Sequence, residues 1–292
     1  MKKLPIPNSE LIINDDGSVF HLHIKPEDVA DIVIMMGDPD RVNAVASFFD
    51  TIELDKRSRE FHTITGTYHG KRVTALSHGI GTDNIDIVMT EIDALANVDF
   101  KTRLPKLKHR RLSILRIGTC GAIRPEIPLG SYILSHISIG FDSVLHWYKD
   151  GETICLKDFE EAFVQHMGWP ERIGRPYFVR SSETLIQKFQ DWTVKGMTVS
   201  APGFYGPQGR CVRLKLTIPD LVEKLECFEH EGYHVTNFEM ESSCLSGMAT
   251  LLGHDATTIC LAIANRHIKE SDPDYLPLMK QLVRRALETL TA

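Results

Sequence analysis

The sequence predicts an α/β fold with a mixed β-sheet, and three observations support this. Apolar, β-branched runs that end in glycine are followed by helix-like periodicity in residues 30–49 and 72–96. A further apolar run, residues 255–267, leads into the C-terminal region. Between the first two, residues 59–77 hold two alternating segments joined by Tyr-His-Gly-Lys, which is typical of an antiparallel hairpin. Because strand–helix repeats favour parallel strands, the hairpin makes the sheet mixed.

The first strand is expected to end at Met36, where Gly37 follows. Asp38 is expected to cap the next helix, with Pro39 at its first position, where a fixed φ and a missing N–H are tolerated. Such a turn presents backbone N–H groups at the positive end of a helix, and Arg41 adds a full charge. The turn therefore suits an anion, although the motif alone does not distinguish a phosphate site from a structural turn.

Two further junctions of this kind follow along the chain. Residues 78–84 (His-Gly-Ile-Gly-Thr-Asp-Asn) predict a turn capped by Thr82 or Asp83. Residues 112–123 form a buried-looking strand with a single arginine, Arg116, before an expected turn at residues 118–121. An unpaired arginine inside an apolar strand is costly, so Arg116 needs a carboxylate partner or a bound oxyanion. Arg59 is another candidate for the same anion, although surface arginines are common.

Glu239 and Glu241 stand on either side of Met240, directly before an apolar run. Acids in the first turn of a helix are a common, purely structural preference. Alternatively, both acids serve one cleft or supply the partner of Arg116. In an extended chain residues two apart point the same way, whereas two steps along a helix turn by roughly 200°. The two acids can share a cleft only at a strand-to-helix junction.

The composition excludes several classes of function. A chain of 292 residues with a net charge of −6 and a pI of about 6.1 lacks the basic footprint of a nucleic-acid-binding protein. No apolar run approaches the roughly 18 residues of a membrane span, and residues 1–10 do not resemble a secretory signal. We therefore expect a cytoplasmic protein with neither nucleic acid nor membrane as a partner. The six cysteines form no CxxC pair, so reduced thiols are expected.

The chain shows no repeat and no linker, so residues 1–292 are expected to form a single domain. Residues 274–292 carry apolar side chains at helical spacing and predict a helix with one buried stripe. The basic segment 99–113 is expected to be a solvated surface connection.

Between about residues 18 and 268 the sequence holds, in order, the motifs VFHL, GDPDRV, REF, GIG, RIGTCGAI, FYGPQGR, NFEMES and AIANR. Together, and with plausible spacing, they resemble the uridine phosphorylase branch of the nucleoside phosphorylase family. The resemblance implies a three-layer α/β/α, phosphorylase/hydrolase-like fold with a mixed central sheet. It also implies cleavage of a nucleoside by phosphate, giving a free base and ribose 1-phosphate, without a catalytic metal or organic cofactor.

The resemblance also assigns roles to individual residues. Phosphate would be bound by Gly37, Arg41, Arg116 and Thr119, with Arg59 reaching it from a neighbouring subunit. Ribose would be held by Met240, Glu241, the supporting Glu239, and His21 of a partner chain. The base would be bound by Phe204, Gln208, Arg210 and Gly121, supported by Asn265 and Arg266. Glu60 resembles a position that some members use for a structural monovalent cation. Residues shared between chains imply a homo-oligomer, at least a dimer.

Substrate choice divides the alternatives. Purine-cleaving relatives carry an aspartate in the segment that matches residues 262–267, whereas Asn265 and Arg266 stand here. The missing aspartate, together with Gln208 and Arg210, favours a pyrimidine nucleoside as substrate, and uridine is the first choice. The sequence leaves three alternatives open: a purine nucleoside phosphorylase, a nucleosidase and a non-catalytic nucleoside-binding protein. A nucleosidase would have little use for arginines that bind phosphate. It does not fix the deoxyribose preference, the subunit count or the direction of reaction.

Overall fold

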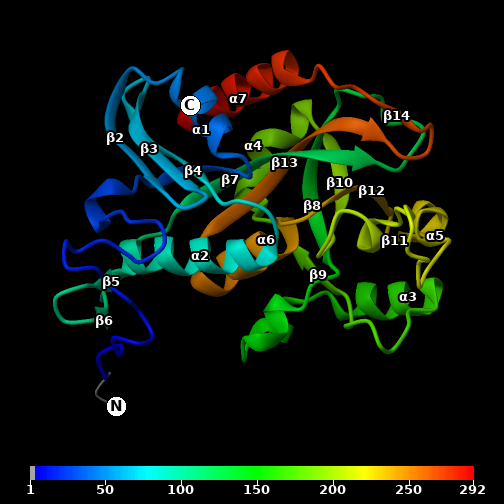
Figure 1. Cartoon of the computed structure of the whole chain (residues 1–292), viewed down its shortest axis with the longest axis horizontal. Helices are drawn as coiled ribbons and strands as arrows, with labels where there is room; N and C mark the ends of the chain where they lie inside the picture. The colour runs from blue at the N-terminus through cyan, green and yellow to red at the C-terminus, as the bar shows by residue number, and fades with distance from the viewer. Residues whose placement is uncertain (1–3) are drawn as a thin grey trace.

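A large mixed β-sheet organises residues 4–292, the part of the chain that this computed structural model describes (Figure 1). The strands are β1 (Ile32–Met36), β2 (Thr51–Ser58), β3 (Phe61–Tyr68), β4 (Lys71–Ser77), β5 (Val98–Asp99), β6 (Leu104–Pro105), β7 (Ser113–Ala122), β8 (Tyr132–Gly140), β9 (Tyr177–Arg180), β10 (Val194–Ser200), β11 (Glu229–His230), β12 (Tyr233–Glu239), β13 (Asp255–Asn265) and β14 (Glu270–Ser271). The order in the sheet is β11-β12-β10-β8-β13-β7-β1-β4-β3-β2, with β9 beside β8 and β14 beside β13.

The pairing directions confirm the mixed sheet. Strand β1 runs parallel to both β4 and β7, and β7 runs parallel to β13. Strands β2, β3 and β4 are antiparallel, as are β8 and β13. Strand β12 pairs with β10 in parallel and also with β7 in antiparallel fashion, at Asn237–Ala122 and Phe238–Gly121. This second pairing closes β7, β13, β8, β10 and β12 into a ring.

Seven α-helices are found in the described residues, and they pack on both faces of the sheet. They are α1 (Pro39–Ala46), α2 (Thr82–Asn97), α3 (Lys157–Met167), α4 (Glu183–Phe189), α5 (Leu221–Cys227), α6 (Ser242–Leu252) and α7 (Leu276–Thr291). The apolar residues of α2 and α6 share one core cluster with the sheet, and those of α1, α4 and α7 share another (Figure 1). Two helical layers thus cover the sheet, which confirms the expected three-layer α/β/α architecture.

Locally signalled elements are found where the sequence predicts them. Strand β1 ends at Met36, Asp38 caps α1 by accepting from the Asp40 N–H, and Pro39 is the first helical residue. Strands β3 and β4 form the predicted hairpin, whose turn residues His69 and Gly70 both have positive φ, as a type I′ turn requires. Helix α7 buries one apolar stripe along the predicted segment.

Two local predictions are wrong. Residues 118–121 do not form a turn, because β7 continues through them to Ala122. Gly118 is needed there for space: a Cβ atom would lie 2.8 Å from Nη1 of Arg116, which folds back along its own strand. Helix α2 is capped by neither Thr82 nor Asp83, because Gly81, with φ of 95°, occupies the cap position.

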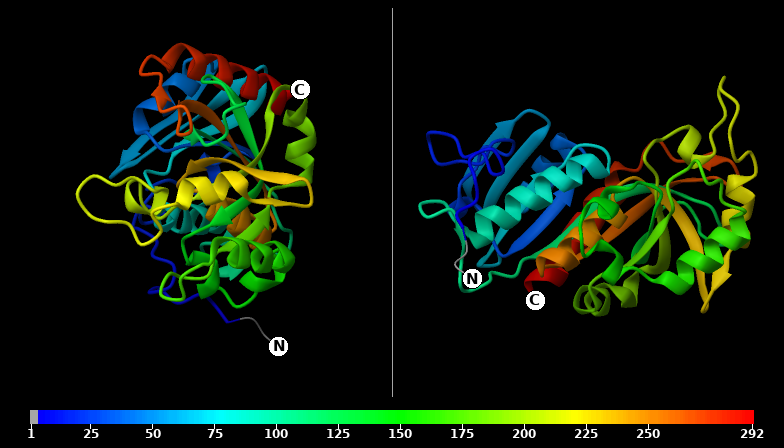
Figure 2. Two further views of the ribbon diagram at one scale, coloured as in Figure 1. Left: turned by 90° about the vertical axis from the view of Figure 1, so that its right-hand side faces the viewer. Right: turned by 90° about the horizontal axis from the view of Figure 1, so that it is seen from below.

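The molecule is elongated, with the β2–β4 hairpins toward one end and α3 and α5 toward the other (Figure 2). Residues 99–113 form a largely exposed connection, as predicted, in which Arg110 and Arg111 are paired with Asp31 and Asp255. Within residues 4–292, none of the helices is both long and apolar enough to span a bilayer.

Candidate active site

A cavity of about 730 Å³ opens where β1, β4, β7 and β12 end, and it gathers most of the predicted site residues. Those that line it are Gly37, Arg41, Glu60, Arg116, Thr119, Gly121, Phe204, Gln208, Arg210, Glu239, Met240 and Glu241. Because these strands are neighbours in one sheet, segments distant in sequence reach the same edge. The other predicted residues, His21, Arg59, Asn265 and Arg266, lie outside its lining.

The floor of the cavity holds a buried ionic cluster around Arg116. Its Nη1 lies 2.9 Å from Oε2 of Glu239, and its Nη2 donates to Oε2 of Glu241. All three side chains are at most 5 % exposed. The buried arginine therefore has both carboxylates as partners. Burial alone would lower the pKa of Arg116, but Glu241 and Glu239 together raise it above the ordinary value, so the guanidinium stays charged.

Glu239 serves this cluster as a support. One or both of its oxygens accept from the backbone N–H groups of Glu241 and Ser242 and from the hydroxyls of Ser200 and Ser242. Because the carboxylate is already saturated, Glu239 is placed to hold Arg116 and the start of α6, and not as a free acceptor for a sugar hydroxyl. The two acids do lie at a strand-to-helix junction, since β12 ends at Glu239 and α6 begins after Glu241.

Glu241 has fewer hydrogen-bond partners than Glu239. Its Oε1 accepts from the Gly81 N–H at 2.7 Å, and its Oε2 accepts from Arg116. Burial is the main cause that raises the pKa of Glu241 to about 7; Arg116 opposes this and Glu239 adds to it. One guanidinium cannot neutralise two buried carboxylates, so this group takes up a proton near neutral pH.

The turn between β1 and α1 forms one wall of the cavity, and this wall has a positive potential. Arg41 lies in the first turn of α1, where its Nη2 donates to the Tyr275 hydroxyl at 3.0 Å. Its Nε is buried and has no hydrogen-bond partner in the described residues. The Oδ2 atom of Asp38 lies 4.0 Å from this Nε, too far for a hydrogen bond, so the buried donor is costly unless a ligand meets it. Together with the α1 N-terminus, Arg41 makes this wall suitable for an anion.

The opposite end of the cavity is built from the loop after β10. Phe204 is 51 % exposed and does not pack in the core. The guanidinium of Arg210 lies 3.8 Å from the centre of its ring and also donates to Oε1 of Gln208. Burial, followed by the charge of Arg266, lowers the pKa of Arg210 to about 10. This end therefore offers an aromatic face, an amide and a cation.

Arg266, the residue after β13, supports this loop, and Asn265 at the end of β13 fixes the neighbouring backbone. Arg266 donates to the Gln208 carbonyl at 3.0 Å, and a Cβ atom on Gly121 would lie 3.4 Å from its Cγ. Asn265 is buried; its amide donates to the Arg124 and Ile127 carbonyls and its oxygen accepts from two backbone N–H groups beyond it. Asn265 thus fixes the backbone, and Arg266 reaches the loop.

His21 and Arg59 lie together elsewhere on the surface. The guanidinium of Arg59 lies 5.1 Å from the centre of the Phe20 ring, and Nδ1 of His21 lies 2.6 Å from Oε1 of Glu91. Glu60, next to Arg59, is exposed at the cavity edge. Two clusters of His, Asp or Glu with metal-ligand spacing occur in residues 4–292, and Glu60 belongs to neither.

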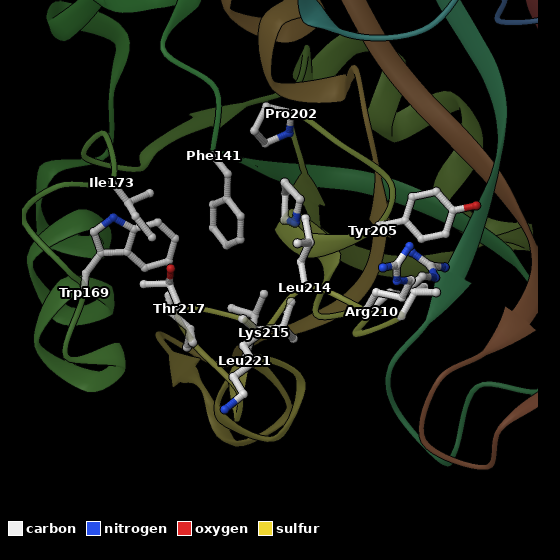
Figure 3. A pocket seen from close by; sticks show the side chains of 16 residues that line it. Phe141, Trp169, Ile173, Pro202, Tyr205, Arg210, Leu214, Lys215, Thr217 and Leu221 are labelled. Carbon is white, nitrogen blue, oxygen red and sulfur yellow. The ribbon is translucent and has the colours of Figure 1, made fainter.

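A larger, mainly apolar cavity of about 820 Å³ adjoins the base-side loop and shares Arg210 with the first (Figure 3). Trp169 and Arg210 lie on opposite sides of it. Among residues 4–292 no carboxylate lines it, and its charged lining residues are Arg210, Arg213 and Lys215. It lacks the combination of buried charges found in the smaller cavity, which we therefore take as the candidate active site.

Sequence reasoning missed several residues that lie outside the cavity lining and hold its charged side chains. His78 contacts Arg116, the Gly81 N–H holds Glu241, and Cys260 lies 3.8 Å from Nη1 of Arg116. The motif at residues 78–84 contains two of these three, but its residues predict only a turn, and the resemblance of GIG assigns no role to either. Cys260 carried no local signal, because strand pairing alone brings it beside Arg116.

Comparisons with known proteins agree with this geometry. The family model of the phosphorylase superfamily matches residues 31–291. A uridine phosphorylase of Thermococcus kodakarensis is 28 % identical over 88 % of this chain and 80 % of its own length. A DeoD-type purine nucleoside phosphorylase of Aliivibrio fischeri is 26 % identical over 86 % of this chain and 87 % of its own.

Among solved structures, a Trypanosoma brucei nucleoside phosphorylase described as showing uridine phosphorylase activity is 30 % identical. It superimposes with a TM-score of 0.87, covering 96 % of this chain and 99 % of that one. The resemblance inferred from the motifs is therefore confirmed, and this chain belongs to the phosphorylase superfamily.

Proposed function

We propose that the protein cleaves a pyrimidine nucleoside by phosphorolysis, converting uridine and inorganic phosphate to uracil and ribose 1-phosphate. One observation carries the proposal: a single cavity holds an anion-binding wall, a buried carboxylate and an aromatic–amide–cation group at its far end. The relatives named as uridine phosphorylases support the choice of substrate.

Phosphate binds between the α1 turn and the end of β7. The unpaired Nε of Arg41 and the backbone at Gly37 face it from one side. Arg116 and the hydroxyl of Thr119 face it from the other. Guanidinium groups suit this role because their forked donors match pairs of phosphate oxygens.

The sugar lies over Met240 and Glu241. The carboxylate of Glu241 accepts hydrogen bonds from ribose hydroxyls, and the Gly81 N–H and Arg116 fix its orientation. Glu239 does not touch the sugar in this scheme. It holds the arginine, and through the start of α6 it holds Glu241.

The pyrimidine lies against Phe204 and meets Gln208 and Arg210 at its polar edge. During the reaction the bond between the sugar carbon and the base nitrogen breaks while a phosphate oxygen bonds to the same carbon. The electron pair leaves with the base, whose oxygen becomes anionic. Arg210 stabilises this charge, Arg266 holds the loop through the Gln208 carbonyl, and Asn265 fixes the backbone that carries Arg266.

Phosphate is itself the nucleophile, so no protein nucleophile takes part and no cofactor is required. Cys120 lines the cavity, but burial raises the pKa of its thiol well above the ordinary value and keeps it protonated. A monovalent cation near Glu60 and a cytoplasmic location remain predictions from the sequence, and no step depends on either.

We further propose that the active protein is a homo-oligomer, at least a dimer, in which a second copy supplies Arg59 and His21. The support is that both residues lie outside the cavity of their own chain, while Phe20 and Arg59 form an exposed pair. Mixing inactive Arg59→Ala and Arg210→Ala proteins under subunit exchange should restore part of the activity. No recovery after verified exchange would contradict a shared site.

The function is tested by incubating the protein with uridine, with and without phosphate, and following ultraviolet absorbance. Loss of uridine only with phosphate is expected. Loss without phosphate would indicate a nucleosidase, and tight binding without turnover would indicate a nucleoside-binding protein. Thymidine and inosine assayed in parallel test the preference for a pyrimidine, and preferred cleavage of inosine would contradict it.

Arg210→Ala is the sharpest variant for this function. Removing one preorganised donor to the developing charge should lower kcat for uridine about a hundredfold or more. Arg210→Lys keeps the charge but loses the forked donors, so it is the matched control. Its kcat should lie between those of the wild type and Arg210→Ala. Unchanged turnover by a folded Arg210→Ala protein would reject the role of this residue.

A further inference from the structure

His78 is a fully buried histidine that lies between the β1–α1 turn and Arg116, the two sides of the proposed phosphate site. It directly follows β4, and its backbone N–H donates to the Met36 carbonyl at 2.8 Å. A Cβ atom placed on Gly37 would lie 3.8 Å from the ring carbon Cε1 of His78. The imidazole therefore packs directly against the glycine turn that the proposed function assigns to phosphate.

The same ring contacts Arg116 on the next strand but one. Nε of Arg116 donates to Nε2 of His78 at 3.1 Å. An arginine Nε always carries its hydrogen, so Nε2 must present a lone pair and the hydrogen of the imidazole lies on Nδ1. Burial, followed by the charge of Arg116, lowers the pKa of His78 well below its ordinary value, and the Gly79 backbone opposes this weakly. His78 is therefore neutral.

The second ring nitrogen makes this residue unfavourable for folding. Nδ1 of His78 is buried and makes no hydrogen bond of good geometry in residues 4–292; the Gly79 backbone lies near enough to favour the charged ring but does not satisfy this nitrogen. A buried donor without a partner destabilises the folded state. An apolar side chain of similar size would avoid this cost, so packing alone does not account for a histidine here.

The contacts of Arg116 indicate what the histidine contributes. Its Nη1 and Nη2 face the carboxylates of Glu239 and Glu241, which lie two residues apart at one junction. His78 is the partner of Nε, outside the Nη1–Nη2 edge that faces the carboxylates. With this edge and Nε both held, the plane of the guanidinium is fixed while a hydrogen on Nη2 is left over. Without His78, the carboxylates and the long contact of Nη1 with the Cys260 sulfur, at 3.8 Å, are left to hold the group, and Nε has no partner to stop it from rotating.

We propose that His78 is a positioning residue that fixes the guanidinium of Arg116 and thereby raises the affinity of the cavity for phosphate. The inference rests on the proposed role of Arg116 at the phosphate. It assigns His78 no contact with the reacting atoms. The affinity should therefore depend on a hydrogen-bond acceptor at the position of Nε2, and not on an imidazole as such.

Two substitutions separate this role from packing. His78→Leu fills similar space without an acceptor and removes the unpaired donor, so its thermal midpoint should equal or exceed that of the wild type. Its Kd and KM for phosphate should nevertheless rise about tenfold or more, as expected for losing a hydrogen bond to a charged group. Its KM for uridine should change less. His78→Gln can place a carbonyl oxygen near the Nε2 position and should stay within about threefold of wild type.

Phosphate binding is read directly as the shift of the thermal midpoint with added inorganic phosphate, without nucleoside, alongside KM for each substrate. The inference is overturned if His78→Leu binds phosphate as the wild type does. It is also overturned if His78→Gln loses as much affinity as His78→Leu. If the wild type neither responds to phosphate nor turns over uridine, the proposed function itself fails, and this inference with it.

Discussion

The two ends of the candidate active site are built differently. At the phosphate and ribose end, Arg116, Glu239 and Glu241 come from strand ends and are almost completely buried. At the base end, Phe204 and Arg210 come from a loop and remain partly exposed. The first end holds its charges by mutual pairing across strands, whereas the second holds Arg210 through contacts within one loop.

The two ends of the site therefore have different tasks. Groups that must meet the same phosphate and sugar in every turnover lie on rigid strand ends, where their positions are fixed by the sheet. Groups that select a base lie on a loop, where changes disturb the core little. Substitutions at the first end should therefore affect both stability and activity, and those at the second end mainly activity.

The largest effect is expected on stability at the rigid end. Replacing Arg116 by Met removes the partner of two buried carboxylates, which should lower the free energy of unfolding by about 3–5 kcal/mol. Urea denaturation measures this change. Arg210→Met is the matched control at the loop end and should cost less than about 1 kcal/mol. An equal loss of unfolding free energy in the two variants would contradict the difference between the rigid end and the loop end.

The next effect concerns the affinity for phosphate. Arg41→Ala removes the buried Nε that lacks a partner, so KM for phosphate should rise about ten- to a hundredfold. KM for uridine should change by much less. Tyr275→Phe removes only the hydroxyl that Arg41 contacts and should have a smaller effect. An equal rise of both KM values in Arg41→Ala would place this residue away from the phosphate.

A pH dependence is expected from Glu241. Its pKa is raised from 4.5 to about 7, so the folded protein binds this proton more tightly than the unfolded chain does. The contribution to stability is present below about pH 4.5 and is lost as the pH rises through about 7. Because the ionised form accepts from ribose hydroxyls, nucleoside affinity should fall as the pH drops below 7, by at most about tenfold per unit.

This dependence is best measured by calorimetric titration of uridine without phosphate, because phosphate itself titrates near neutral pH. Glu241→Gln cannot ionise, so its weaker binding should not change over the same range. A wild-type affinity that stays constant from pH 5.5 to 8 would contradict the assignment of Glu241 to the ribose.

The smallest effect is expected at the loop end. Phe204→Leu removes the ring that lies 3.8 Å from the Arg210 guanidinium, which should raise KM for uridine about two- to fivefold. Phe204→Tyr keeps the ring and should behave like the wild type. The free energy of unfolding should stay within about 0.5 kcal/mol in both, since the side chain is exposed. A large loss of stability would show that this loop is part of the core.

Sequence reasoning succeeded where a feature depends on neighbouring residues. The capped turn at Asp38, the hairpin at His69 and the strand-to-helix junction at Glu239 all follow from local conformational preferences. The motif resemblance added the grouping of Arg41, Arg116 and the loop residues, which local preferences do not contain.

It failed where the strand order decides the outcome. Gly118 suggested a turn, yet the glycine provides space for Arg116 beside a continuing strand. His78 and Cys260 contact Arg116 only because β4, β1, β7 and β13 are arranged in that order. The choice of Glu239 as support and Glu241 as the available acid depends on Ser200, on a strand that no motif marked.

The antiparallel pairing of Phe238 with Gly121 has a consequence for folding kinetics. It joins segments more than a hundred residues apart, so the ring of strands can close only late, after its local hairpins and helices have formed. Arg116 meets its carboxylates through that closure. During refolding, recovery of phosphate binding should therefore lag behind the recovery of helical circular dichroism, because ligand binding reports the final long-range step.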